Sequence, residues 1–319
     1  MNLDRYRECR LCPRSCGVDR TSGKKGVCRQ TATCRISSAG PHYGEEPSFT
    51  GSHGSGTIFF SGCSCLCFFC QNYQISAGGM GWDIAPEELV HTARSLALSG
   101  VHNLNFVTPD HFWPHIRHLC QELKKEGVSI PTIFNSSGYQ RADLVEEYAE
   151  CIDIFMPDFK FAQPQLAKEC MGDELYPDVA LKALQKMVEL KGFLDPWDPT
   201  GLQPAQRGVL VRHLVLPGHV ENSLEVMRLL RAEFGKLLPL SVMSQFHPVP
   251  GCVERKHLCR GISREEHEKV RDLVYELGFQ HVYLQDIPDT TDFLPDFSLE
   301  EPFEGNKKRR SKQSSKDQA

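Results

Sequence analysis

Between residues 57 and 285 the chain alternates short β-rich runs with amphipathic helical patterns, and this alternation limits the folds that it can adopt. Strands separated by helices are joined by right-handed crossovers and lie parallel in a sheet. Doubly wound sheets and (β/α) barrels both satisfy the pattern. The expected strands are Thr57–Ser61, Asn103–Thr108, Ile130–Asn135, Ile152–Met156, Val209–Leu216, Leu240–Phe246 and His281–Leu284, and the expected helices are Pro86–Ser99, Ile116–Glu126, Ala142–Glu150, Pro177–Lys191, Ser223–Phe234 and Arg264–Leu277.

The residues at the ends of the expected strands favour the barrel. Cys63 comes shortly after the first strand, Asn135 and Asp158 come at or just after the ends of later ones, and His247 follows Phe246 directly. A barrel builds its site from polar residues that converge at the carboxyl ends of its strands. We therefore expect a full or partial barrel with its site at this end.

Three cysteines, Cys63, Cys67 and Cys70, form a C-x3-C-x2-C pattern just after the first expected strand. A [4Fe–4S] cluster that only carries electrons normally has four cysteine ligands, so three ligands leave one iron free to coordinate a small molecule. The alternative is a structural zinc knuckle, which needs a fourth Cys or His ligand and usually C-x2-C spacing.

Composition indicates a reduced, soluble enzyme. The chain has 319 residues and 14 cysteines, yet its start has no apolar signal core and no stretch is apolar enough to span a bilayer. Thiols spaced for metal without an export signal indicate the cytoplasm. The net charge of −5 argues against a dedicated nucleic-acid surface. The basic run Lys307–Lys312 lies in a polar tail that we expect to be disordered.

The stretch Gly54–Asn72, with Glu45-Glu-Pro47 upstream, resembles the radical S-adenosylmethionine (SAM) family related to pyruvate formate-lyase activating enzyme, and more specifically its PflX-like branch. The resemblance runs from about Tyr6 to about Gln285. It implies a partial (β/α)6 barrel, one [4Fe–4S] cluster, SAM as cofactor, and a 5′-deoxyadenosyl radical made by one-electron cleavage of SAM.

The resemblance implies that Cys63, Cys67 and Cys70 are the cluster ligands. Cys65 has no counterpart in the family motif, and we interpret it as a non-ligand because a fourth thiolate would block the iron that SAM needs. Phe69 occupies the aromatic position that packs near the adenine, and this role is compatible with that of a core aromatic. Asn72, directly after the loop, is a further candidate contact of the cofactor.

The remaining cofactor contacts are also implied by the resemblance. The family's Gly-Gly-Glu motif, which contacts the SAM amino group, is absent here, and Thr108 or Asp110 could accept that contact instead. Asp110 could equally be the N-cap of the helix that follows. Asn135 matches a residue that binds the amino acid part of SAM, although a turn-capping asparagine is an equal alternative. Asp158 and Lys160 match an Asp-x-Lys motif. Arg212 matches a partner of the SAM carboxylate, and His247 matches a residue at the SAM ribose.

A second set of cysteines, Cys9, Cys12, Cys16 and Cys28, has the spacing C-x2-C-x3-C-x11-C. Four thiols at such spacing are a strong metal signal, and zinc and a second iron–sulfur cluster both fit. The expected organisation is therefore a Cys-rich segment over residues 1–56, a radical SAM barrel over 57–287, and a C-terminal extension over 288–319 with a disordered basic end.

The leading functional hypothesis is a radical SAM enzyme whose 5′-deoxyadenosyl radical abstracts a hydrogen atom. The resemblance suggests a glycine of a glycyl radical enzyme as the target and a flavodoxin or ferredoxin as the electron donor. The near alternative is a different peptide or small-molecule substrate. The alternative from another class is a non-catalytic zinc-binding interaction protein.

Overall fold

Two sheets carry the expected strands in a computed structural model that describes residues 1–288 and 293–303. The larger sheet has the order β3-β1-β2-β4-β5-β6-β7 and the smaller has the order β10-β9-β8. From β2 to β7 and from β8 to β10 all neighbours pair in parallel, and a bridge between Asp158 and Arg212 joins β6 to β8. The parallel strands are β2 (Ser55–Phe60), β4 (Leu104–Val107), β5 (Thr132–Ser136), β6 (Ile154–Pro157), β7 (Gly208–Val209), β8 (Val211–Leu214), β9 (Leu240–Met243) and β10 (Val282–Leu284).

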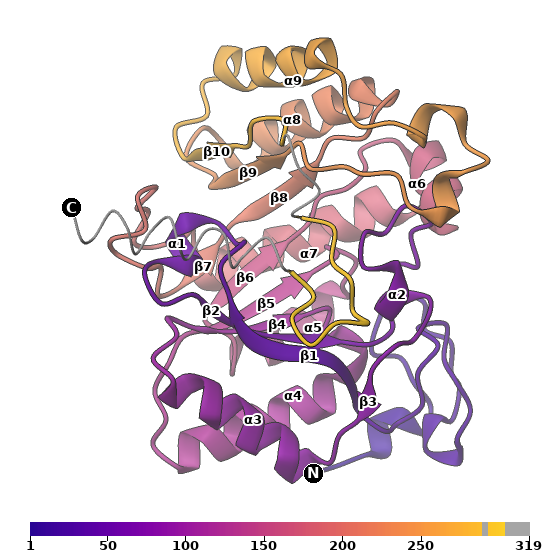
Figure 1. Cartoon of the computed structure of the whole chain (residues 1–319), viewed down its shortest axis with the longest axis vertical. Coiled ribbons are helices and arrows are strands. Elements are labelled where there is room, and N and C mark those ends of the chain that lie inside the picture. Colours follow the sequence, from indigo (N-terminus) through magenta and orange to yellow (C-terminus); the bar gives the residue numbers. More distant parts are fainter. Residues whose placement is uncertain (289–292, 304–319) are drawn as a thin grey trace.

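Helices lie outside the strands, with α3 and α4 at the bottom and α8 and α9 at the top of Figure 1. This arrangement confirms the expected α/β class with a parallel sheet. The main helices are α3 (Pro86–Leu98), α4 (Trp113–Lys125), α5 (Ala142–Ala149), α6 (Pro164–Met171), α7 (Tyr176–Lys191), α8 (Val220–Phe234) and α9 (Arg264–Glu276), and the short ones are α1 (Pro47–Thr50) and α2 (Tyr73–Ser76). All of them except α6, α1 and α2 overlap an expected helix.

The ends of these helices follow from local chemistry. Ser263 caps α9, because its hydroxyl accepts the Glu266 N–H at 3.2 Å while the Glu266 carboxylate accepts the Ser263 N–H at 2.7 Å. Pro86 starts α3, where its missing N–H costs nothing. The two helices begin at Pro86 and Arg264, the residues at which the expected ranges begin.

The expected strand Val209–Leu216 is interrupted, and this corrects the sequence prediction. The Leu210 N–H bonds to the Phe155 carbonyl in β6, whereas the Val211 N–H bonds to the Pro239 carbonyl before β9. The chain therefore changes partner between two consecutive residues, and its halves belong to different sheets. An apolar run does not reveal this change, because both halves are buried.

The Cys-rich segment is not separate from the barrel. Its strand β1 (Arg35–His42) pairs antiparallel with β2 on one side and with β3 (Trp82–Asp83) on the other, and most of β2 and all of β3 lie beyond residue 56. Figure 1 shows β1 crossing in front of the parallel strands. Residue 56, the expected boundary, therefore lies inside β2, in a sheet shared by both segments.

Part of the expected C-terminal extension packs on the barrel. Phe297 is buried, and its ring lies 5.4 Å from that of Phe59 in a T-shaped contact. Gln74, a residue of α2, donates to the Asp296 carboxylate at 3.0 Å, and this bond holds the segment around Asp296 and Phe297 against α2. The basic run Lys307–Lys312 lies outside the described residues.

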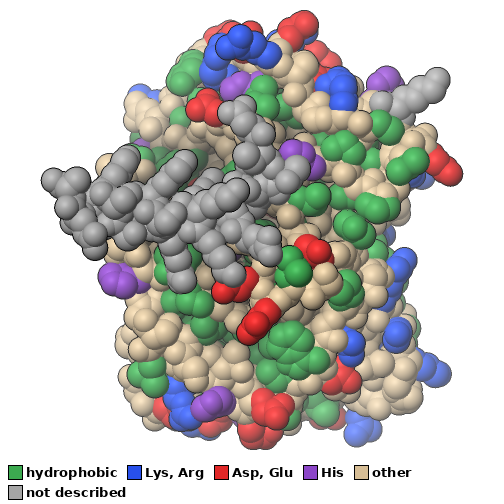
Figure 2. Space-filling view, viewed as in Figure 1, with side chains coloured by type: hydrophobic (Ala, Val, Ile, Leu, Met, Phe, Trp, Pro, Cys, Tyr) green, Lys and Arg blue, Asp and Glu red, His purple; other side chains and the backbone are tan. Residues whose placement is uncertain are grey.

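Where the described residues form the surface in Figure 2, acidic and basic side chains are scattered among apolar ones. In the described part of the chain, no helix combines the length and the apolar character needed to cross a bilayer.

Candidate functional site

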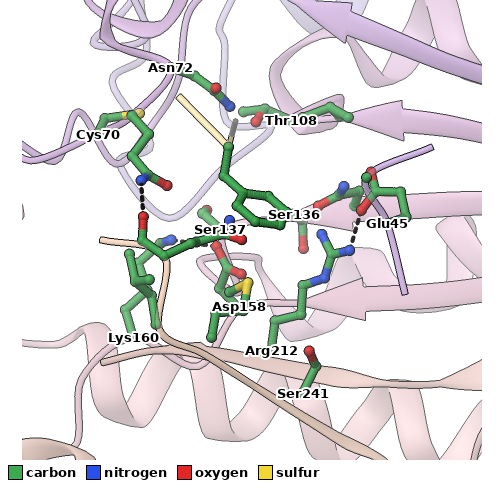
Figure 3. A pocket seen from close by; sticks show the side chains of 18 of the residues that line it. Glu45, Cys70, Asn72, Thr108, Ser136, Ser137, Asp158, Lys160, Arg212 and Ser241 are labelled. Atoms are coloured by element: carbon green, nitrogen blue, oxygen red, sulfur yellow. Dashed lines mark hydrogen bonds and ion pairs between the residues drawn. The ribbon is translucent and has the colours of Figure 1, made fainter. Parts of the chain in front are cut away.

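A cavity of about 460 Å³ opens at the carboxyl ends of the parallel strands, and Figure 3 looks into it. The barrel therefore places its polar strand ends together, as the sequence predicts. His247 is not among the lining residues, and its Nε2 is buried without a hydrogen-bond partner among the described residues. The predicted site residues that line the cavity are Cys63, Cys67, Phe69, Cys70, Asn72, Thr108, Asn135, Asp158, Lys160 and Arg212.

The cysteine loop follows β2 and turns tightly. The Cys70 N–H donates to the Cys67 carbonyl at 3.1 Å, and the Phe68 N–H donates to the Cys170 carbonyl at 3.2 Å. Leu66 has a φ of 50°, a left-handed conformation that a side chain rarely adopts. The loop is thereby bent so that the three motif cysteines line one cavity.

The thiols of this loop are buried and interact with one another. The Cys65 N–H donates to Cys63 Sγ at 3.4 Å, and the Ser76 hydroxyl donates to Cys70 Sγ at 3.3 Å. Burial raises the pKa of Cys70 to about 12, whereas a hydrogen bond from the Cys65 thiol lowers the pKa of Cys63. Cys65 also lines the cavity, so proximity alone does not separate it from the motif cysteines.

Asp158 and Lys160 form an ion pair just beyond the end of β6. Burial disfavours the charge of Lys160, but the adjacent Asp158 carboxylate more than offsets this and raises the pKa of Lys160 well above its usual value. Gly138 has a φ of 75°, and a Cβ there would run into the Asp158 carbonyl, so only glycine fits this close approach. The ion pair is thus held in one place between two strand ends.

Arg212 lies in a buried charge group that the sequence does not reveal. Its Nε donates to Glu46 at 2.9 Å, and its Nη2 contacts the carboxylates of both Glu45 and Glu46. Figure 3 shows Glu45 and Arg212 in contact with each other, both as part of the cavity wall. Burial opposes ionisation of Glu45, yet the charge of Arg212 keeps the pKa of that carboxyl below its usual value. Two of the guanidinium nitrogens are therefore already engaged by this chain.

Thr108 and Asn135 come from neighbouring strand ends. The Thr108 N–H donates to the Asn135 carbonyl at 2.8 Å. Thr108 has a φ of 55°, which is unusual for a β-branched residue and turns the chain away from the strand axis. Phe69 packs edge-on against Phe161 and tilted against Phe246, so it is a core aromatic that also lines the cavity.

Several lining residues are absent from the sequence prediction. Glu45 and Glu46 precede β2, and the sequence marks them only as part of the Glu45-Glu-Pro47 stretch of the family resemblance, without a role for either side chain. Phe293 and Phe303 belong to the C-terminal extension and have no recognisable signal. The other lining residues not predicted include His42, Gln71, Ser136, Ser137, Ser241, Met243, Gln245, Tyr283 and Gln285.

The donor set suits an iron–sulfur cluster, because three soft thiols share one cavity and leave space beside them. Among the described residues, no three Cys, His, Asp or Glu side chains form a group that could hold a metal ion as they stand. The sulfur atoms of the loop would therefore reorient around a cluster.

Comparison with known proteins gives the family. Residues 57–231, more than half of the chain, match the family model of the Radical SAM superfamily. The chain belongs to this superfamily. An uncharacterized protein of Methanocaldococcus jannaschii (MJ0674) is 26% identical over 284 residues, which cover 87% of this chain and 77% of that protein.

Two solved structures are similar. Methylornithine synthase (PylB) is 15% identical with a TM-score of 0.49, and the match covers 79% of each chain. The radical SAM methyltransferase TsrM from Kitasatospora setae is 11% identical with a TM-score of 0.50, covering 93% of this chain and 66% of that one. At this identity the second match shows a shared fold alone.

Membership makes the chain a radical SAM enzyme, with a [4Fe–4S] cluster and SAM as cofactors and a 5′-deoxyadenosyl radical as the reactive species. This excludes the interpretation of the whole chain as a non-catalytic zinc-binding protein. The match is to the superfamily, so the PflX-like branch and the individual cofactor contacts stay predictions.

Proposed function

We propose that Cys63, Cys67 and Cys70 ligate the cluster and that SAM binds in the adjoining cavity. The observation that carries this proposal is the shared lining: three thiols from one loop face polar groups from several strand ends across about 460 Å³. The bound cofactors supply the radical. The chain binds and orients them and keeps the cavity walls fixed.

Opposite charges in the cavity suit the groups of SAM. The carboxylate of Asp158 can pair with an ammonium or sulfonium, and Lys160 and Asn135 can donate to a carboxylate. Phe69, Asn72 and Thr108 remain candidate contacts. Arg212 keeps its proposed role only through Nη1, the nitrogen outside its bonds to Glu45 and Glu46. His247 lies off the cavity lining, which argues against its proposed contact with the ribose.

For the substrate, the motif resemblance supports hydrogen abstraction from a glycine in a partner glycyl radical enzyme, with flavodoxin or ferredoxin as electron donor. A second candidate is a small charged substrate. The buried group of Glu45, Glu46 and Arg212 favours it, because a glycine backbone offers no charge for these side chains to recognise.

The experiment follows deuterium. Anaerobically reconstituted, dithionite-reduced enzyme with SAM is incubated with extract from cells grown in D₂O, separated into protein and small-molecule fractions. Mass spectrometry then measures deuterium in 5′-deoxyadenosine. Transfer from the protein fraction supports glycyl radical formation, and transfer from the small-molecule fraction supports the second candidate.

The control is the enzyme with Cys63, Cys67 and Cys70 replaced by Ala, which should release no 5′-deoxyadenosine. If the unmodified enzyme also releases none when its cluster is reduced, the proposed cleavage of SAM in this cavity is wrong.

A further inference from the structure

The four N-terminal cysteines gather in one knot, formed by residues 9–30, beside the cluster loop. The Gly17 N–H donates to the Cys9 carbonyl and the Ser15 N–H donates to the Cys12 carbonyl, both at 3.0 Å. These bonds fold the C-x2-C-x3-C run back on itself. Cys9, Cys12 and Cys28 are buried, and Cys16 is partly buried.

Gly26 shows how closely two of the sulfurs approach. A Cβ added at Gly26 would lie 3.3 Å from Cys16 Sγ and 3.4 Å from Cys28 Sγ. The same point lies 3.8 Å from Cδ of Arg20. Because Gly26 has no side chain, the sulfurs of Cys16 and Cys28 both pack against this one backbone position. Among the described residues no three of these thiols form a group that could hold a metal as they stand, so the thiols of the knot, like those of the loop, would reorient around one.

Arg20 is the feature that ordinary core packing does not explain. Its side chain is 1% exposed, between the rings of Tyr6 and Phe112. Its guanidinium donates to the carbonyls of Thr31 and His111 and to Cys9 Sγ, the last at 3.6 Å. Among the described residues none of its bonding partners is a carboxylate. A buried guanidinium is costly without an opposite charge nearby.

We propose that Cys9, Cys12, Cys16 and Cys28 bind a thiophilic metal centre as four thiolates, and that Arg20 compensates its charge. Four thiolates around one divalent ion, or around a [4Fe–4S] cluster, leave a net negative charge, which is what the buried guanidinium lacks. Binding releases the thiol protons to solvent and involves no change of oxidation state. The site is separate from the SAM cavity, so the proposal of this metal site does not depend on which substrate the enzyme takes.

The knot also supports the cluster loop. Arg14, inside the knot, donates to the Ser64 carbonyl at 3.0 Å and to the Met171 carbonyl at 2.5 Å. A Cβ at Gly62 would lie 2.5 Å from the Cys28 carbonyl, so the two segments touch backbone to backbone. Figure 1 shows the N-terminal loops beside α2, which follows the cluster loop. A metal that orders the knot therefore steadies one wall of the loop.

The test uses the full chain with Cys63, Cys67 and Cys70 replaced by Ala, so that any remaining metal belongs elsewhere. Protein purified anaerobically is analysed for zinc, iron and sulfide. About one zinc per chain, or iron with sulfide, supports the site and tells an ion from a cluster. Absence of metal in this variant, or disulfide-linked cysteines in anaerobic protein, overturns the proposal.

Two further variants in the same background locate the metal. Cys16→Ser alters the most exposed ligand, and Cys120→Ser makes the same change at a partly buried cysteine outside the knot. In the presence of a chelator, Cys16→Ser should lose its metal at least ten-fold faster than the parent protein. The control variant should lose its metal at the same rate as the parent. Equal retention in both overturns the ligand assignment.

Arg20 is tested by Arg20→Met and Arg20→Lys. If its charge compensates the centre, Arg20→Met should lose metal to the chelator faster than Arg20→Lys, because only lysine keeps the charge. After exchange of the metal for Co²⁺, the thiolate charge-transfer absorption of Arg20→Lys should match that of the parent. Equal retention by the two variants refutes the role of Arg20.

Discussion

Replacing Arg212 by alanine removes the cation between Glu45 and Glu46 and leaves two neighbouring carboxylates buried. The Arg212 side chain is 11% exposed, and those of Glu45 and Glu46 are 7% and 8% exposed. Breaking such a buried pair by removing one partner costs about 3–5 kcal/mol. At roughly 2 °C per kcal/mol for a chain of this size, the melting temperature should fall by about 6–10 °C.

The control is Arg207→Ala. Arg207 pairs with Asp195, but their side chains are 69% and 61% exposed. An exposed pair contributes about 0–1 kcal/mol, because water screens both charges. Both variants lose the same side chain, so the difference between them isolates the effect of burial. Circular dichroism under anaerobic conditions measures the melting temperatures.

The pH dependence gives a second, independent readout. In the unmodified protein the pKa of Glu45 is lower in the folded chain than in the unfolded chain. The ionised carboxylate therefore stabilises the fold fully at pH values above its unfolded-state pKa, and this stabilisation is lost only as the pH falls through its folded-state pKa. In Arg212→Ala the carboxylates lack their cation, so burial and mutual repulsion raise their pKa. At pH 5.5 these carboxyls take up protons more readily in the folded variant than they do at pH 7.5. The difference in the free energy of unfolding between Arg212→Ala and the unmodified protein should therefore be smaller at pH 5.5 than at pH 7.5, by roughly 1–3 kcal/mol. The reasoning would be refuted if the melting temperature of Arg212→Ala fell no further than that of Arg207→Ala. It would also be refuted if the difference in the free energy of unfolding between Arg212→Ala and the unmodified protein grew at lower pH.

The other predictions concern single sites. Cys65→Ala should keep the absorption of the loop cluster, and loss of that absorption would show that Cys65 is a ligand. Lys160→Ala should weaken SAM binding by roughly 10–100-fold in an equilibrium titration, because a charge-assisted hydrogen bond contributes about 1.5–3 kcal/mol; unchanged affinity would remove Lys160 from the site. Gly138→Ala should destabilise the chain by at least about 1–3 kcal/mol, since the backbone is left-handed there and the new Cβ meets the Asp158 carbonyl. Ser263→Ala should cost about 1 kcal/mol through the lost cap of α9, without change in SAM affinity.

The sequence by itself determined the features that depend on neighbours along the chain. Hydrophobic periodicity locates the helices, and strand–helix alternation gives the parallel sheet. The cysteine spacing places three thiols in one loop after β2. Because parallel strands share their carboxyl edge, the positions of Asn135 and Asp158 also followed from the chain.

Tertiary structure alone decided the contacts between distant segments. Glu45 and Glu46 meet Arg212 across more than 160 residues, and no local pattern marks this pairing. The same holds for Phe293 and Phe303 at the cavity and for the change of partner at Leu210. Such contacts depend on how complete elements pack, since burial and charge pairing are satisfied only when segments remote in the chain come together. The sequence therefore predicted the cluster loop, whereas the charge group facing it emerged only from the fold.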